Sequence, residues 1–132
     1  MVDASTIVEH LVGPTRDSAL ALLIESNPAR LCAPHLCDAE VLSAFRRLTA
    51  NGTLTPAAST TRLRLFRRLP LHRFSHRALL DQAFEYRDNF SAYDALYVAL
   101  AERLGAPLMT CDLRLRDAMR RFSPVQPFDP RE

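Results

Sequence analysis

The sequence contains no lysine and few glycines: all seventeen basic residues are arginine, and only three glycines are present. The absence of lysine excludes mechanisms that require a catalytic lysine. Three scattered glycines cannot form a glycine-rich loop that binds phosphate. No apolar run approaches the length of a membrane span, and the N-terminus lacks a basic region followed by an apolar stretch. We therefore expect a cytoplasmic protein that does not enter a membrane.

Cysteine is also scarce. The three cysteines are odd in number, which favours reduced and mostly buried thiols. Cys32, Cys37 and His35 lie close together in the sequence, but no fourth ligand follows at a spacing typical of zinc. We do not expect a zinc site there.

The chain has 132 residues, of which 48% are hydrophobic, so it is long enough for one domain with its own core. It shows no repeats, low-complexity run or linker. Residues 1–132 are therefore predicted to form a single domain.

Charge is distributed unevenly although the net charge is only +2. The span 41–80 contains eight arginines and no acidic residue, whereas the rest of the chain has nine arginines and fifteen acids. A basic middle in an acidic frame indicates a polyanionic partner, and a solvated helix face explains it equally well. Charge alone leaves both interpretations open.

The stretch 91–112 is the most informative part of the chain. Ser91 is a good N-cap for a helix, and Asp94 stands where a capping carboxylate belongs. Residues 92–101 are apolar or aromatic except Asp94, which predicts a buried helix. A strand is expected at 107–110, with Asp112 just past its end. A carboxylate inside a buried helix is costly unless the helix N-terminus or a metal ion stabilises it.

Periodicity and turn residues predict an alternation of short strands and helices. Thr6 and Glu9 fit a capping box for the first helix. Val41, Leu42 and Phe45, with Leu48, fit the core stripe of another helix. The order implies a mainly parallel sheet covered by helices on both faces, whose ligands bind beyond the carboxyl ends of the strands. The expected strands are 1–3, 30–33, 71–74, 107–110 and 125–128, and the expected helices are 5–12, 15–26, 34–51, 55–68, 75–86, 91–104 and 113–121.

Four acids occupy positions that such a sheet brings to one edge. Asp3 and Asp112 follow predicted strands, Asp94 opens the buried helix, and Glu40 lies near the start of the helix at 34–51. Taken singly, each has a simpler explanation as a helix cap or a solvated edge. Converging carboxylates raise one another's pKa, and a divalent cation relieves that repulsion. Hard oxygen ligands favour Mg²⁺ or Mn²⁺ over zinc.

Four segments together resemble the PIN-domain ribonucleases, specifically the VapC-type toxins of bacterial toxin–antitoxin pairs. They are V-D-A-S at 2–5, E-V-L-S-A-F-R-R at 40–47, Y-D-A-L-Y-V-A-L-A at 93–101 and T-C-D-L-R-L at 110–115. The resemblance implies a Rossmann-like α/β/α sandwich. It also implies that the four acids bind Mg²⁺ or Mn²⁺ and that two small hydroxyls support them, at Ser5 and Thr110. Asp38 and Asp117 are neighbouring acids that we do not count.

The resemblance also implies a reaction and partners. A metal-activated water would hydrolyse RNA and leave a 5′-phosphate, and a small antitoxin protein and a homodimer are expected. No Ser–His–Asp or Cys–His arrangement is evident among the four histidines. An aspartate-dependent phosphatase is disfavoured because Ser5 stands where haloacid-dehalogenase-type enzymes need a second aspartate. A catalytically silent interaction module is disfavoured because all four acids are present.

Two surfaces are predicted from the same sequence. The arginines at 62–68 are expected to contact RNA or the antitoxin, with a merely solubilising role as the alternative: Arg62, Arg64, Arg67 and Arg68. The helices at 5–12 and 15–26 carry more large aliphatic side chains than a thin sheet edge needs, which favours an interface. These side chains are Ile7, Val8, Leu11, Val12, Leu20, Leu22, Leu23 and Ile24.

Overall fold

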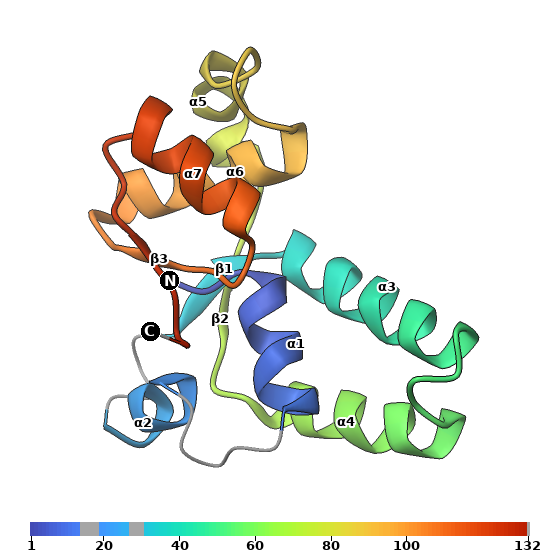
Figure 1. Cartoon of the computed structure of the whole chain (residues 1–132). Helices are drawn as coiled ribbons and strands as arrows, with labels where there is room; N and C mark the ends of the chain where they lie inside the picture. The colour runs from blue at the N-terminus through green and yellow to red at the C-terminus, as the bar shows by residue number, and fades with distance from the viewer. Residues whose placement is uncertain (14–18, 27–30, 132) are drawn as a thin grey trace.

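The computed structural model describes residues 1–13, 19–26 and 31–131 of the chain (Figure 1). Short strands alternate with helices as the sequence predicts. The elements are α1 (Ala4–Val12), α2 (Ala19–Ser26), β1 (Cys32–Pro34), α3 (Leu36–Ala50), α4 (Pro56–Arg68), β2 (His72–Phe74), the 3₁₀ helix η2 (Arg77–Leu79), α5 (Leu80–Glu85), α6 (Ala92–Leu104), β3 (Leu108–Met109), α7 (Leu113–Phe122) and β4 (Pro127–Phe128).

The strands form two parallel pairs, β1 with β2 and β3 with β4. The N-terminal segment joins the pairs, because Val2 bridges Met109 in parallel and its N–H donates to the Cys32 carbonyl at 3.0 Å. The spatial order is thus β2, β1, Val2, β3, β4. Pairing is parallel within β1 and β2 and within Val2, β3 and β4. Residues that follow β1, Val2 and β3 line one cavity, so these carboxyl ends meet at one edge. The predicted parallel sheet is confirmed, and the expected first strand is reduced to a single bridging residue.

Helices cover both faces of these strands (Figure 1). Helices α5, α6 and α7 lie on one side, and α1, α2 and α4 lie on the other. Helix α6 is the central one, with every side chain from Tyr97 to Ala101 at most 2% exposed. The prediction of a buried helix there is confirmed. The result is the α/β/α arrangement that the sequence predicts.

Most helix boundaries follow from capping residues. The side chain of Ser91 caps α6 as predicted, and the side chain of Thr55 caps α4. Gly105 ends α6 in the left-handed conformation at φ 59°. The predicted capping box of Thr6 with Glu9 is wrong. Asp3 caps α1 instead, by accepting a hydrogen bond from the Thr6 backbone N–H at 3.0 Å. The helix consequently begins one residue early.

Three other expectations differ from the structure. Helix α3 begins at Leu36 because Pro34 belongs to β1. The helix expected at 75–86 is the short η2 followed by α5. Leu42 is 57% exposed, since it lies 100° around the helix from buried Val41 and both cannot face the core. Parts of the helix expected at 15–26 and of the strand expected at 30–33 fall outside the described residues.

The predicted surplus of aliphatic side chains on α1 and α2 is wrong. Ile7 and Leu20 are fully buried, and five of the others pack against the same core: Val8, Leu11, Val12, Leu23 and Ile24. Only Leu22, at 59% exposure, is largely open to solvent. Exposed apolar side chains on other helices include Leu80 and Phe84 of α5. No helix in the described part of the chain is long and apolar enough to cross a membrane.

Candidate active site

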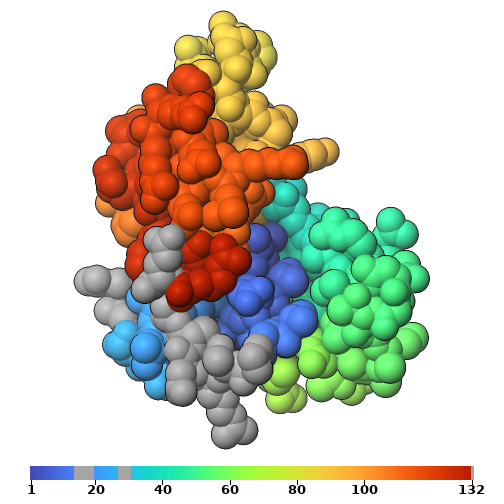
Figure 2. Space-filling view, viewed as in Figure 1, coloured from blue at the N-terminus to red at the C-terminus, as the bar shows by residue number. Residues whose placement is uncertain are grey.

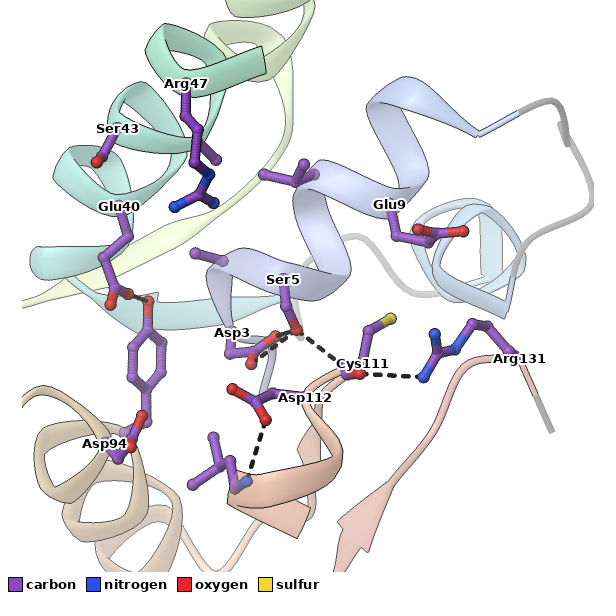
Figure 3. Close-up of a pocket in the computed structure, with 15 residues that line it drawn as sticks. Asp3, Ser5, Glu9, Glu40, Ser43, Arg47, Asp94, Cys111, Asp112 and Arg131 are labelled. Carbon is purple, nitrogen blue, oxygen red and sulfur yellow. Dashed lines mark hydrogen bonds between the residues drawn. The ribbon is translucent and has the colours of Figure 1, made fainter. Parts of the chain in front are cut away.

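A cavity of about 550 Å³ opens at the carboxyl edge of the strands, between α1, α3, α6 and α7. The space-filling view shows a notch between the orange surface of α7 and the cyan-to-green surface of α3, with α1 behind it (Figure 2). All four predicted acids line this cavity: Asp3, Glu40, Asp94 and Asp112. The close-up shows that they come from four separate parts of the chain (Figure 3).

Asp3 is the most constrained of the four acids. Its side chain accepts hydrogen bonds from the hydroxyls of Ser5, at 2.8 and 2.9 Å, and Thr110, at 2.6 Å, and from the Thr6 backbone N–H. Asp3 is only 5% exposed. Burial raises the pKa of this carboxyl, and the bonds from Thr110, Thr6 and Ser5 oppose that rise.

Ser5 and Thr110 also fix the loop that follows β3. The Cys111 backbone N–H donates to Oγ of Ser5 at 2.9 Å, and the Asp112 backbone N–H donates to Oγ1 of Thr110 at 3.0 Å. The two hydroxyls therefore connect the start of α1 to the start of α7. Both hydroxyls thus lie between the Asp3 carboxylate and the backbone at Cys111 and Asp112.

Glu40 projects from the first turns of α3 and is half-buried. The Tyr97 hydroxyl, from α6, donates a hydrogen bond of 2.6 Å to Oε2 of Glu40. Burial raises the pKa of Glu40, the bond from Tyr97 lowers it, and the charges of Asp3 and Asp94 raise it further. Because these carboxylates influence one another, the cavity has an excess of negative charge that a cation would neutralise.

Asp94 lies in the first turn of α6, where its backbone N–H donates to Oγ of Ser91 at 3.1 Å. Burial raises the pKa of Asp94, a side-chain hydrogen bond between its carboxyl and Ser91 lowers it, and the charges of Asp112 and Asp3 raise it. Asp112 caps α7, accepting hydrogen bonds from Arg114 and Leu115 through Oδ1. Its other oxygen points back toward Asp3 (Figure 3). Capping of α7 therefore uses only Oδ1 of the Asp112 carboxylate.

The donor set fits a hard divalent cation. The acids offer carboxylate oxygens only, which suits Mg²⁺ or Mn²⁺. Within residues 1–13, 19–26 and 31–131, no three such side chains are close enough to form a complete metal site. An ion that keeps several of its waters, as Mg²⁺ usually does, can be held by acids spaced around a cavity.

Three further lining residues were not predicted from the sequence. Tyr97 falls within the predicted buried helix, and the signal for its role is that the hydroxyl of a buried tyrosine needs a hydrogen-bond partner. Arg47 lies seven residues after Glu40, which places both on one face of α3, so helical spacing provides a signal for it. Arg131 reaches the cavity from the segment after β4, and no local motif predicts that position.

Asp38 and Asp117, the two neighbouring acids in the sequence, lie outside the cavity. Asp38 accepts from Nε of Arg73 at 2.8 Å, and Asp117, which is 64% exposed, lies 3.7 Å from Arg120. Neither lines the cavity.

The predicted arginine group on α4 lies outside the cavity as well. Arg62 donates through Nε to the Leu11 carbonyl at 3.0 Å and so connects α4 to the end of α1. Three members of the group are exposed: Arg64, Arg67 and Arg68.

The fold and the acid-lined cavity define a PIN domain, and the PIN domain family model matches residues 1–120. The crystal structure of PAE2754 from Pyrobaculum aerophilum has the same fold, with a TM-score of 0.68 over 96% of this chain and 80% of that one, at 22% identity.

Curated relatives define the group more narrowly. Ribonuclease VapC9 of Mycobacterium tuberculosis is 41% identical over 125 residues, covering 95% of this chain and 94% of the relative. Ribonuclease VapC3 of the same species is 40% identical over 118 residues, covering 89% and 85%. The chain belongs to the VapC-type members of the PIN domain family.

Proposed function

We propose that the protein is an endoribonuclease toxin of a toxin–antitoxin pair that hydrolyses RNA phosphodiester bonds with the help of Mg²⁺ or Mn²⁺. The observation that carries this proposal is the convergence of four carboxylates on one cavity: Asp3, Glu40, Asp94 and Asp112. The names of the relatives, which are ribonucleases at up to 41% identity, support RNA as the substrate.

The four acids would hold the ion. When bound, the ion supplies activation of the attacking water and offsets the charge that builds on the phosphate. The chain's own groups orient the carboxylates: Ser5 and Thr110 fix Asp3, and Tyr97 fixes Glu40. Asp94 and Asp112 contribute charge from the opposite elements, α6 and α7. Orientation of this kind lowers the reorganisation needed during reaction.

Protein partners follow from the same assignment. We propose a small antitoxin protein as inhibitor and a homodimer as the assembly. Exposed apolar surface on α5 supports a protein contact, because Leu80 is 57% exposed and Phe84 is 65% exposed. Both side chains line a groove of about 400 Å³ between α5 and α6. The arginines on α4 are proposed to contact RNA or the antitoxin, with Arg62 also serving the packing of α1.

Cleavage of a 5′-labelled single-stranded RNA tests the proposal. We expect cleavage in Mg²⁺ or Mn²⁺, none in EDTA, and products with a 5′-phosphate. Asp94→Asn should abolish the reaction, whereas Asp117→Asn, at an exposed acid outside the cavity, should not. Equal cleavage in EDTA would contradict the metal requirement. A protein that neither binds Mn²⁺ nor cleaves RNA would instead be a silent interaction module.

A further inference from the structure

A fixed cation stands at the rim of the acid-lined cavity, on the side away from Glu40 and Asp94 (Figure 3). It is the guanidinium of Arg131, which lines the cavity from the segment after β4. Its Nε and one terminal nitrogen donate to the two oxygens of Asp129, both at 2.9 Å. The same terminal nitrogen donates to the Cys111 carbonyl at 3.0 Å. A forked pair of this kind fixes both the position and the plane of the guanidinium.

The carboxylate that holds Arg131 is itself rigidly placed. Asp129 is only 5% exposed, and it also accepts from a terminal nitrogen of Arg116 at 2.7 Å. Hydrogen bonding to Arg131 is the main reason that the pKa of Asp129 falls to about 2. Two guanidiniums therefore share one carboxylate. Arg131 is the partly exposed member of this cluster, and its side chain is 47% exposed, whereas the Arg116 side chain is 11% exposed.

The hydrogen bonds of Arg131 leave part of the group available. A guanidinium has five N–H donors. Nε uses one on Asp129, and NH2 uses its two on Asp129 and Cys111. Within the described residues, no hydrogen bond engages NH1, and the side chain is 47% exposed. Two donors on a pre-oriented cation are thus accessible from the cavity.

The negative charge of the cavity suggests that these N–H donors bind an RNA phosphate. Four carboxylates repel an RNA backbone, so productive binding requires cations beside them. We propose that NH1 of Arg131 binds a non-bridging oxygen of the phosphate next to the scissile one and sets the register of the strand. This proposal rests on the proposed function, because it takes RNA as the ligand. Glu9, on α1, also faces Arg131 and is expected to weaken this contact (Figure 3).

A phosphate-by-phosphate experiment tests the assignment. Single-stranded RNAs, each with one neutral methylphosphonate, are bound to Asp94→Asn protein, and affinity is measured by fluorescence anisotropy. With Arg131 present, one position should show a loss of about tenfold or more, as expected for a charge-assisted hydrogen bond. With Arg131→Ala added, the methylphosphonate at that position should no longer reduce the affinity, whereas the reductions at the other positions should remain. The slope of log affinity against log salt concentration should also fall by about one.

Two matched variants keep the test decisive. Arg120→Ala removes an exposed arginine of α7 outside the cavity and should change no position selectively. Glu9→Gln leaves the Arg131–Asp129 pair intact and should enhance the penalty at the same position. It provides the test on its own if Arg131→Ala fails to fold.

Three results would overturn the assignment. If the affinity loss at each phosphate is the same with and without the Arg131 side chain, Arg131 serves only to hold the C-terminal segment in place. Loss of antitoxin binding with unchanged RNA binding would assign the group to a protein partner. An absence of RNA binding by every variant would also remove the proposed function, whereas equal penalties in a protein that cleaves RNA would remove only this inference.

Discussion

Tyr97 of α6 and Glu40 of α3 are joined at one side of the cavity by a hydrogen bond of 2.6 Å from the tyrosine hydroxyl to Oε2 of the carboxylate. Tyr97 is 2% exposed, and burial together with the neighbouring Cys37 and Glu40 raises its pKa. The hydroxyl is the donor of this hydrogen bond to the carboxylate. The bond fixes one oxygen of the Glu40 carboxylate, on a side chain that lines the cavity.

Tyr97→Phe removes this donor while preserving the ring that fills the core. We expect the affinity for Mn²⁺ and the cleavage rate to fall by about tenfold, as is typical when a group that orients a metal ligand is lost. The free energy of unfolding should fall by only about 1 kcal/mol. Calorimetric titration with Mn²⁺ checks the first effect, and Tyr93→Phe, at a tyrosine that is 62% exposed, is the control. Unchanged Mn²⁺ affinity would show that Glu40 needs no such support.

The pH dependence of stability follows from the raised pKa values of Asp3, Glu40 and Asp94. A carboxyl whose pKa is higher in the folded state binds protons there more readily than in the unfolded chain. Its stabilising effect is complete below the ordinary carboxyl pKa and is lost as pH rises through the raised value. In EDTA, the melting temperature should therefore increase as pH is lowered from about 7 toward about 5.

Asp94→Asn should reduce that increase, because one of the three titrating groups is removed. At neutral pH in EDTA its melting temperature should equal or exceed that of the wild type, since repulsion with Asp112 and Asp3 is relieved. Below about pH 4 both proteins should lose stability as Asp129, whose pKa is lowered to about 2, becomes protonated. Parallel pH profiles for the two proteins would mean that Asp94 does not titrate in this range.

The α4 arginines should separate into two groups. Arg62→Ala removes the hydrogen bond to the Leu11 carbonyl and should lower the melting temperature. Arg67→Ala with Arg68→Ala should leave the melting temperature unchanged but weaken RNA or antitoxin binding and flatten its salt dependence. Anisotropy titrations at several salt concentrations check the second effect. If affinity and salt slope both stay constant, these two arginines only solubilise the helix.

Inhibition by a basic antitoxin tail should depend on the metal. The cavity attracts cations, so an arginine from the partner would pair with Asp94 or Asp112 and compete with the ion. Titrating Mn²⁺ into the inhibited complex should then restore part of the RNA cleavage. Full suppression at saturating Mn²⁺ would mean that the partner blocks RNA access without entering the acid cluster.

Local sequence signals predicted much of the fold. Ser91 sets the start of α6 through chemistry that operates within one turn, so it could be identified without tertiary information. Thr55 and Gly105 act over the same short range at the start of α4 and the end of α6. Asp3 and Asp112 could be placed at one edge because parallel strands share the direction of their carboxyl ends. The error at the start of α1 is also local. Both Asp3 and Thr6 can cap a helix there, and the structure uses Asp3.

Long-range contacts could not be predicted in this way. Arg131 reaches the cavity only because β4 pairs with β3 and Asp129 is buried against Arg116, and neither contact has a local signature. The aliphatic residues of α1 and α2 looked excessive because the depth of the core depends on how the helices pack together. The partner of the Tyr97 hydroxyl likewise depends on the distance between α6 and α3.

Metal binding at the four acids is the central claim, and titration of Mn²⁺ into the metal-free protein tests it most directly. We expect measurable binding by the wild type and strong loss in Asp3→Asn and Asp94→Asn, with their folds intact by circular dichroism. Asp117→Asn should bind like the wild type. Undiminished Mn²⁺ binding by Asp94→Asn, accompanied by undiminished RNA cleavage in highly purified protein, would contradict the account.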